Sequence, residues 1–233
     1  MAAPRTLAHP APAPMVHRYP THAESSAALA EQVAATLRDA VDHRGDASLA
    51  VPGGTTPAEF LDALGERSLD WPRVTVLLTD ERWVAPDHPR SNTALVDRTL
   101  GARGRPYRWY PLWRAGATPE QATAILEAGA GAVTFPLDVV VLGMGDDGHV
   151  ASLFPGDESG YADAASRFVA VRGPGGEPRV SLSAAVLAQA REVYVLLRGA
   201  ARLGVLERAL GGDLPVARLV AARRGRVHVY AGE

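Results

Sequence analysis

The sequence predicts an α/β protein with a single domain, built on a doubly wound, mostly parallel sheet with helices on both faces. Two observations carry this prediction. Runs of β-branched and aliphatic residues without polar alternation recur along the chain, as at 138–142, and are typical of strands buried on both faces of a sheet. Segments with apolar residues at helical spacing separate these runs, and a 47% apolar composition over 233 residues supports a sizeable core.

The N-terminal end differs in composition from the rest of the chain. Residues 1–20 are rich in Ala and Pro, so we expect a mobile tail followed by one domain at residues 21–233. No long apolar segment indicates a signal peptide or a membrane span, which favours a cytoplasmic protein. Neither an internal repeat nor a shift in composition marks a further domain boundary.

Helices and strands alternate in the remainder. Leu29, Val33 and Leu37 mark the first helix by their spacing, and the segment 42–45 ends it. Thr56 is the expected cap of the next helix, with Pro57 in its first turn. Helices are expected at 22–41, from 57 onward, from 92 to about 100, and at 119–130, 184–190, 199–210 and 216–222. Strands are expected at 48–51, 74–79, 139–142, 167–171, 180–182, 193–197 and 227–230, the last as an edge strand.

Polar residues follow three of the strands, and the ends of strands are where open α/β sheets bind ligands. The first such loop contains Gly53, Gly54 and Thr55 ahead of a helix. Glycine lets a backbone approach an anion, and the free N–H groups and dipole of the helix attract it, so this loop is a candidate phosphate site. An ordinary capped helix is the alternative, because short Gly-rich turns are common.

The second polar loop begins with Asp80 and Arg82 directly after a strand, and it includes His88. The alternative to a functional role is a surface ion pair, which contributes little. The loop ends at Ser91 and Asn92, the chain's only asparagine, and either residue can cap the following helix.

The third loop, GMGDDGH at 143–149, places two adjacent acids and a histidine directly after the buried strand at 139–142. A histidine changes charge near neutral pH, and a neighbouring carboxylate such as Asp147 can orient it, which is the minimal equipment for general acid–base catalysis. The alternative is that glycines such as Gly145 form a turn and His149 caps a helix that begins at Val150.

Composition excludes several chemistries. The chain has no cysteine, which removes disulfides, thiolate nucleophiles and zinc–cysteine sites. It also has no lysine, so all 24 basic residues are Arg and lysine-based Schiff-base chemistry is excluded. A net charge of −2 gives no general basic field for a nucleic-acid partner. Anions are instead expected to bind locally to Arg, which recognises carboxylate and phosphate bidentately.

The chain contains four blocks in this order: VPGGTTP at 51–57, TDERWVAPDHPRSN at 79–92, GMGDDGHVASLFPG at 143–156 and PRVSLSAAVL at 178–187. Together they resemble the 6-phosphogluconolactonase family. The resemblance implies a fold shared with the glucosamine-6-phosphate deaminases. It also implies hydrolysis of 6-phospho-D-glucono-1,5-lactone, the second step of the oxidative pentose phosphate pathway. In that reaction His149 would act as the base on the attacking water, and Asp147 would orient its imidazole.

The resemblance also implies how the substrate is held. The candidate substrate-binding residues are Gly53, Gly54, Thr55, Asp80, Arg82, His88, Ser91, Asn92, Gly145, Arg179 and Arg202. Family members commonly carry Lys where Arg202 stands, and the assignment of phosphate and oxyanion among the three arginines stays open. We expect no cofactor and no metal, because His88 and His149 lack ligand spacing. The expected partner is a small sugar-phosphate lactone, with no nucleic acid or membrane, and the chain is expected to form a monomer or small homo-oligomer.

Two other functions fit parts of the sequence. Deaminases of the same fold share Asp-Gly-His at 147–149 but typically carry Asn and Glu four and five residues after the histidine, where this chain has Leu153 and Phe154. The second alternative is a sugar-phosphate sensor domain of a transcription regulator, which is disfavoured because residues 1–20 are not a helix-turn-helix. Residues 157–165, polar and rich in small side chains, are expected to form a mobile segment over the site.

Overall fold

The computed structural model describes residues 12–233. Its central element is a seven-stranded sheet in which every pairing is parallel, with the strand order β1-β10-β9-β6-β2-β3-β5. The strands are β1 (Met15–Tyr19), β2 (Ala47–Val51), β3 (Val74–Leu78), β5 (Arg108–Tyr110), β6 (Val139–Leu142), β9 (Glu192–Arg198) and β10 (Val227–Gly232). Every residue of β2, β3 and β6 is buried, as their unbroken apolar runs predict.

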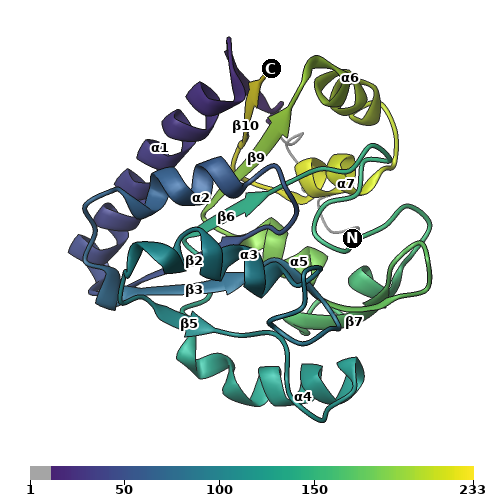
Figure 1. The fold of residues 1–233 in the computed structure, drawn as a ribbon. Coiled ribbons are helices and arrows are strands. Elements are labelled where there is room, and N and C mark those ends of the chain that lie inside the picture. Colours follow the sequence, from purple (N-terminus) through teal and green to yellow (C-terminus); the bar gives the residue numbers. More distant parts are fainter. Residues whose placement is uncertain (1–11) are drawn as a thin grey trace, which may run out of the picture.

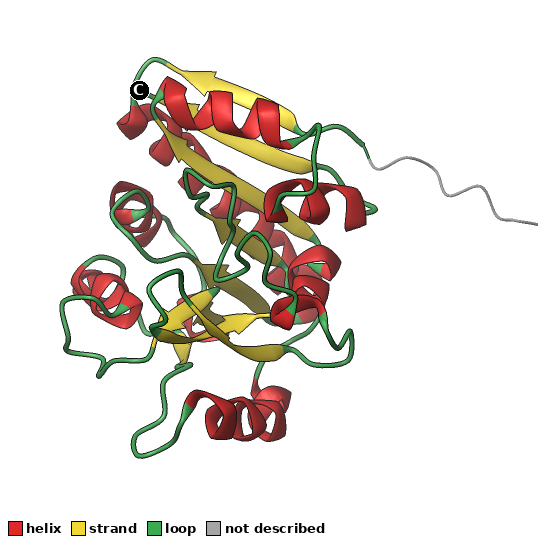
Figure 2. Ribbon diagram, turned by 90° about the vertical axis from the view of Figure 1, so that its right-hand side faces the viewer, coloured by secondary structure: helices red, strands yellow, loops and turns green. Residues whose placement is uncertain are grey.

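Helices cover both faces of this sheet (Figures 1 and 2). The helix α1 packs against β2, β9 and β10 with α2 beside it, while α6 packs against β9, β10 and α7. The helices are α1 (His22–Arg44), α2 (Ala58–Gly65), α3 (Asn92–Arg98), α4 (Pro119–Gly129), α5 (Ala184–Gln189), α6 (Ala200–Ala209) and α7 (Pro215–Ala222). The predicted doubly wound α/β fold is confirmed. No helix within residues 12–233 is long and apolar enough to cross a bilayer.

Capping side chains set several helix boundaries. Thr21 and Glu24 form a reciprocal capping box at the start of α1, and Gly45 ends that helix in the left-handed conformation with φ of 86°. Ser91 caps α3 by accepting from the backbone N–H of Ala94, as one of the two predictions for that helix required. The expected cap at Thr56 is wrong, because α2 begins after Pro57 without any side-chain cap.

The tail expected at residues 1–20 is wrong in its last part. Residues 15–19 form the edge strand β1, which pairs in parallel with β10, so β10 is not the edge strand that the sequence predicted. Aromatic packing joins the two strands, since the rings of Tyr19 and Tyr230 stack at 5.9 Å. The first part of the expected tail, residues 1–11, lies outside the described residues.

A second, smaller sheet was not predicted. Its three antiparallel strands have the order β4-β8-β7 and are β4 (Asp80–Arg82), β7 (Phe168–Arg172) and β8 (Pro178–Leu182). The register pairs Asp80 with Ser181 and Arg82 with Arg179. This pairing brings two predicted site regions, almost a hundred residues apart in sequence, to the same place.

The strand order reverses between β2 and β6. From β2 the chain proceeds to β3 and β5 on one side, and from β6 it proceeds to β9 and β10 on the other. The loops that leave the carboxyl ends of β2 and β6 therefore diverge and open a crevice between them, as at the switch point of other doubly wound sheets. These loops are Gly53 to Thr56 and the Gly-rich loop at 143–149.

Candidate active site

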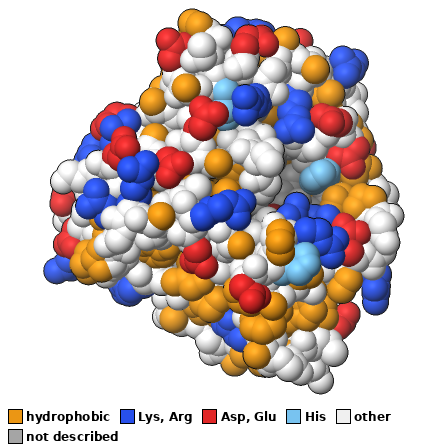
Figure 3. All heavy atoms as spheres, in the orientation of Figure 1, with side chains coloured by type: hydrophobic (Ala, Val, Ile, Leu, Met, Phe, Trp, Pro, Cys, Tyr) orange, Lys and Arg blue, Asp and Glu red, His pale blue; other side chains and the backbone are white. Residues whose placement is uncertain are grey.

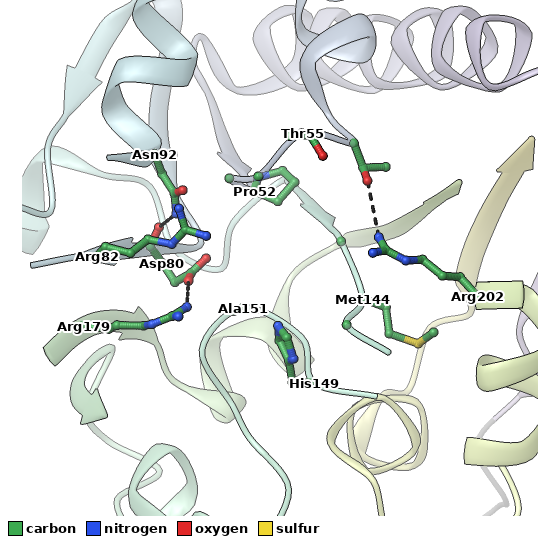
Figure 4. Close-up of a pocket in the computed structure, with 15 residues that line it drawn as sticks. Pro52, Thr55, Asp80, Arg82, Asn92, Met144, His149, Ala151, Arg179 and Arg202 are labelled. Atoms are coloured by element: carbon green, nitrogen blue, oxygen red, sulfur yellow. Dashed lines mark hydrogen bonds and ion pairs between the residues drawn. The ribbon is translucent and has the colours of Figure 1, made fainter. Parts of the chain in front are cut away.

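A cavity of about 260 Å³ lies at this switch point and is lined by residues from two loops, the strands β4 and β8, and the helices α3 and α6. Figure 3 shows Arg and His side chains gathered around the hollow on this face of the molecule, and Figure 4 shows the lining residues. The lining comprises Pro52, Gly53, Gly54, Thr55, Thr56, Asp80, Arg82, Asn92, Gly143, Met144, Gly145, His149, Ala151, Arg179 and Arg202.

His149 projects into the middle of this cavity (Figure 4). Its Nδ1 lies 2.6 Å from Oδ1 of Asp147, and its backbone N–H donates to the same oxygen at 3.1 Å. Partial burial alone would raise the pKa of the Asp147 carboxyl, but these donors from His149 outweigh that effect and lower the pKa. The ionised carboxylate accepts hydrogen bonds only, so Nδ1 carries the proton in this pair, and Nε2 is the nitrogen left for a ligand or water.

Close packing of the loop fixes the His149 ring. A Cβ atom at Gly145 would lie 2.2 Å from two atoms of the ring, so only glycine allows the loop to fold back under the imidazole. On its other side the ring meets Phe154, with 4.9 Å between ring centroids. The alternative, a helix that begins at Val150 with His149 as its cap, is wrong: turns occupy this segment, and Ala151 adopts φ of 50°.

One end of the cavity contains Asp80, Arg82, Asn92 and Arg179 (Figure 4). Arg82 donates through Nη1 to the carbonyl of Arg90 at 2.8 Å, and Asn92 donates through Nδ2 to the carbonyl of Asp80 at 2.7 Å. Three buried polar atoms here have no partner among the described residues: Nε of Arg82, Nε of Arg179 and Oδ1 of Asn92. Buried groups of this kind are normally satisfied, so this end of the cavity suits a polar ligand.

Glu81 supports the end of the cavity that contains Asn92, a role that the sequence did not predict. The side chain is fully buried, and its carboxylate accepts from Ser91 Oγ at 3.0 Å and from the backbone N–H of Asn92 at 2.7 Å and Thr93 at 2.9 Å. A carboxylate at the first turn of α3 also complements the helix dipole. Glu81 therefore fixes the position of Asn92 without reaching the cavity itself.

The opposite end of the cavity contains Arg202 (Figure 4), and the Gly-Gly-Thr-Thr loop runs toward it from Asn92. Arg202 donates through Nη1 to Thr56 Oγ1 at 3.4 Å and through Nε to Asp146 at 3.2 Å, whose side chain is 81% exposed. A Cβ at Gly53 would overlap the amide of Asn92 at 1.8 Å, so this glycine lets α3 and the loop approach each other. Gly54 has φ of 91°, in the region that favours glycine.

Most of the predicted site residues meet in this cavity. Ten of them line it: Gly53, Gly54, Thr55, Asp80, Arg82, Asn92, Gly145, His149, Arg179 and Arg202. Asp147 contacts it through His149. His88 and Ser91 do not line it: His88 is exposed and accepts from the backbone N–H of Arg90, while Ser91 is buried as a helix cap. Residues 157–165 do not line it either, so the segment expected over the site lies elsewhere.

No group of three or more His, Asp and Glu side chains suitable for a metal ion occurs within residues 12–233. The cavity brings together the imidazole–carboxylate pair, the arginines and the backbone of the glycine loops. A parallel α/β sheet with these groups at its carboxyl edge defines a class of enzymes that bind small anionic metabolites.

Comparison with known proteins places the chain within this class. Residues 20–229 match the family described as glucosamine-6-phosphate isomerases/6-phosphogluconolactonase, and the chain belongs to that family. A 6-phosphogluconolactonase from Rhizobium meliloti (strain 1021) is 37% identical over 225 residues, covering 92% of this chain and 97% of the relative. Another from Pseudomonas aeruginosa is 40% identical over 194 residues, covering 81% and 82%.

Solved structures agree with this assignment. A crystal structure of a 6-phosphogluconolactonase from Shewanella baltica OS155 superposes with a TM-score of 0.90 at 32% identity, covering 94% of this chain and 98% of that one. A monomeric glucosamine-6-phosphate deaminase superposes with a TM-score of 0.76 at 18% identity, covering 94% and 97%. The second likeness shows the shared fold alone.

Proposed function

We propose that the protein hydrolyses 6-phospho-D-glucono-1,5-lactone to 6-phospho-D-gluconate in the oxidative pentose phosphate pathway. The observation that carries the proposal is the His149–Asp147 pair at 2.6 Å, set between two arginine-containing ends of one cavity. The relatives named 6-phosphogluconolactonase over most of the chain support the same reaction.

His149 is the general base in this proposal. Its Nε2 takes a proton from a water molecule as the water oxygen bonds to the lactone carbonyl carbon. The resulting tetrahedral oxyanion collapses, the bond from that carbon to the ring oxygen breaks, and the imidazolium returns its proton to the departing ring oxygen. Asp147 holds the ring and stabilises the imidazolium, because the lowered pKa of its carboxyl keeps it ionised.

We assign the substrate phosphate to the end of the cavity with Arg202. Among the described residues, the only carboxylate bonded to Arg202 is the highly exposed Asp146, and the Gly53–Gly54 backbone lets an anion approach the start of α2. At the other end the buried carboxylate of Asp80 would repel a phosphate dianion but can accept from sugar hydroxyls. Arg82 and Arg179 then remain for the sugar and the developing oxyanion.

The proposed reaction uses only groups of the chain, with no cofactor and no metal. Activity should therefore survive dialysis against EDTA, and a loss restored by Zn²⁺ or Mg²⁺ would contradict this mechanism. The proposal includes a cytoplasmic location, a sugar-phosphate lactone as partner with neither nucleic acid nor membrane, and a monomer or small homo-oligomer.

The test is a coupled assay of 6-phosphogluconate formed from freshly prepared lactone, measured above spontaneous hydrolysis, with glucosamine 6-phosphate supplied in parallel. We expect lactone hydrolysis and no ammonia release. A deaminase needs an acid or base for ring opening and proton transfer between carbons, and the apolar Leu153 and Phe154 follow the histidine here. Ammonia release that rivals lactone hydrolysis and disappears in His149→Gln would overturn the proposal.

A further inference from the structure

The proposed mechanism leaves unexplained a buried serine in the same loop as His149. Ser152 is fully buried, and its Oγ donates to Oδ2 of Asp80 at 2.6 Å. Its backbone N–H donates to Ser181 Oγ on β8 at 3.3 Å. The serine therefore connects the catalytic loop to both strands of the second sheet that face the cavity.

The hydroxyl of Ser152 lies beside an incomplete ion pair. Arg179 Nη1 is 3.8 Å from Oδ2 of Asp80, which is longer than a charged hydrogen bond of about 2.7 to 2.9 Å. The same Nη1 is 3.5 Å from Ser152 Oγ. Ser152, and not Arg179, therefore makes the short hydrogen bond to Asp80.

The arginine is otherwise positioned for a ligand. Its Nη2 donates to Glu177, its guanidinium lies over the Phe154 ring at 5.3 Å, and its buried Nε has no partner within the part of the chain that the structure describes. The side chains of Arg179 and Asp80 are only 13% and 9% exposed, and charges in such surroundings attract each other more strongly than in water. Without a competing donor on Asp80, the two groups would close into a direct pair.

We propose that Ser152 is a positioning residue: its hydroxyl occupies the Asp80 carboxylate and so keeps the Arg179 guanidinium from pairing with Asp80, which leaves it able to bind the sugar of the substrate. This inference rests on the proposed lactonase function. The backbone agrees with it, because Ala151 takes a left-handed conformation that is costly for a residue with a Cβ. That conformation separates His149, directed into the cavity, from Ser152, directed toward Asp80.

The decisive experiment is a double-mutant cycle on Ser152 and Asp80, with kcat, KM and Tm measured for each variant. In Ser152→Ala, Arg179 closes onto Asp80, so we expect KM for the lactone to rise about tenfold while kcat changes by less than about threefold. Asp80→Asn removes the charge that captures the arginine. The double variant should therefore have a KM no higher than that of Asp80→Asn alone.

Ser48→Ala is the matched control. Ser48 is also fully buried and bonded to a buried aspartate, Asp138, but it lies at the other end of the sheet. This variant should lower Tm without changing KM. Should Ser152→Ala fail to fold, Ser152→Cys provides the second variant, since a thiol is a weak donor, and the same rise in KM is expected.

An unchanged KM in the Ser152 variant would overturn the inference. A double variant whose KM equals the product of the two single effects would also overturn it, because the residues would then act independently. A wild-type protein without lactonase activity would instead refute the proposed function, and the two failures are thereby distinguished.

Discussion

Two buried aspartates at opposite ends of the parallel sheet, Asp138 and Asp80, differ in how fully their surroundings are hydrogen-bonded. Asp138 precedes β6 at the amino end, is fully buried, and has donors on both carboxylate oxygens. The backbone N–H of Ser48 donates to it at 2.9 Å, Arg44 Nη2 lies at 2.5 Å and Arg191 Nε at 3.3 Å. A buried carboxylate with this many donors contributes to stability and offers nothing to a ligand.

Asp80 follows β3 at the carboxyl end, where Ser152 donates to Oδ2 at 2.6 Å and Thr79 to Oδ1 at 3.3 Å, while Arg179 stops at 3.8 Å. Beside it, Arg82, Asn92 and Arg179 each retain a buried polar atom without a partner among residues 12–233. Such atoms lower stability until a ligand meets them. Within the described residues, the donors around Asp138 complete its contacts at the amino end, whereas three polar atoms beside Asp80 stay unpartnered where substrate is proposed to bind.

The largest loss of activity should come from a change at His149, which lies at the carboxyl end of the sheet. His149→Gln removes the base that activates water, so we expect kcat to fall by about 10²-fold or more while the thermal unfolding temperature stays within a few degrees of wild type. Lactone hydrolysis and circular dichroism on the same sample measure both quantities. His43→Gln is a control, since His43 is an exposed residue in the last turn of α1. Near wild-type activity in His149→Gln would end the general-base assignment.

The reverse behaviour is expected of Asp138. Asp138→Ala leaves the backbone of Ser48 without an acceptor and two arginines without their charge partner. Because Arg44 and Arg191 are 34% and 50% exposed and can return to water, we expect the free energy of unfolding to fall by about 2 to 3 kcal/mol. Urea unfolding measures this loss. The kcat of the folded fraction should be unchanged, and a matching loss of kcat would contradict the division between the two ends.

The sequence predicted the parts of the fold whose signals are local. Unbroken apolar runs located the central strands, and Ser91 was one of two predicted caps for its helix. Polar loops after strands identified most of the cavity lining, because parallel strands direct their carboxyl ends to the same edge.

The features that the sequence did not reveal depend on distant pairings. The strand β1 has five residues and acquires its role only beside β10, more than two hundred residues later. The strand β4 has three residues, too few for a periodic signal, and exists because β8 pairs with it. Glu81 and Ser152 likewise became recognisable only when the fold surrounded them with donors and acceptors.

A change at Arg202, also at the carboxyl end of the sheet, tests where the substrate phosphate binds. If it holds the phosphate, Arg202→Leu should lower kcat/KM for the phosphorylated lactone by about 10- to 10²-fold, because charge-assisted bonds to phosphate are lost. Hydrolysis of unphosphorylated glucono-1,5-lactone, already slow, should hardly change. Arg191→Leu, at the amino end, is the matched control and should lower stability without altering selectivity. Equal losses for the two lactones in Arg202→Leu would show that phosphate binds elsewhere.

Asp147 should give the smallest effect on stability, because its carboxylate is 46% exposed and has one neighbouring residue as donor. The His149 bonds hold its pKa below the ordinary range against the opposing effect of burial. A group with a lowered pKa in the folded state stabilises the protein above its unfolded pKa, and that stability is lost as pH falls through the folded value. Asp147→Asn should thus lower stability near neutral pH by less than about 1 kcal/mol. The difference from wild type should shrink steadily in acid, as measured by urea unfolding across pH. A deficit that stays constant down to the most acidic pH at which the protein folds would show that the loss comes from packing and not from the carboxylate charge.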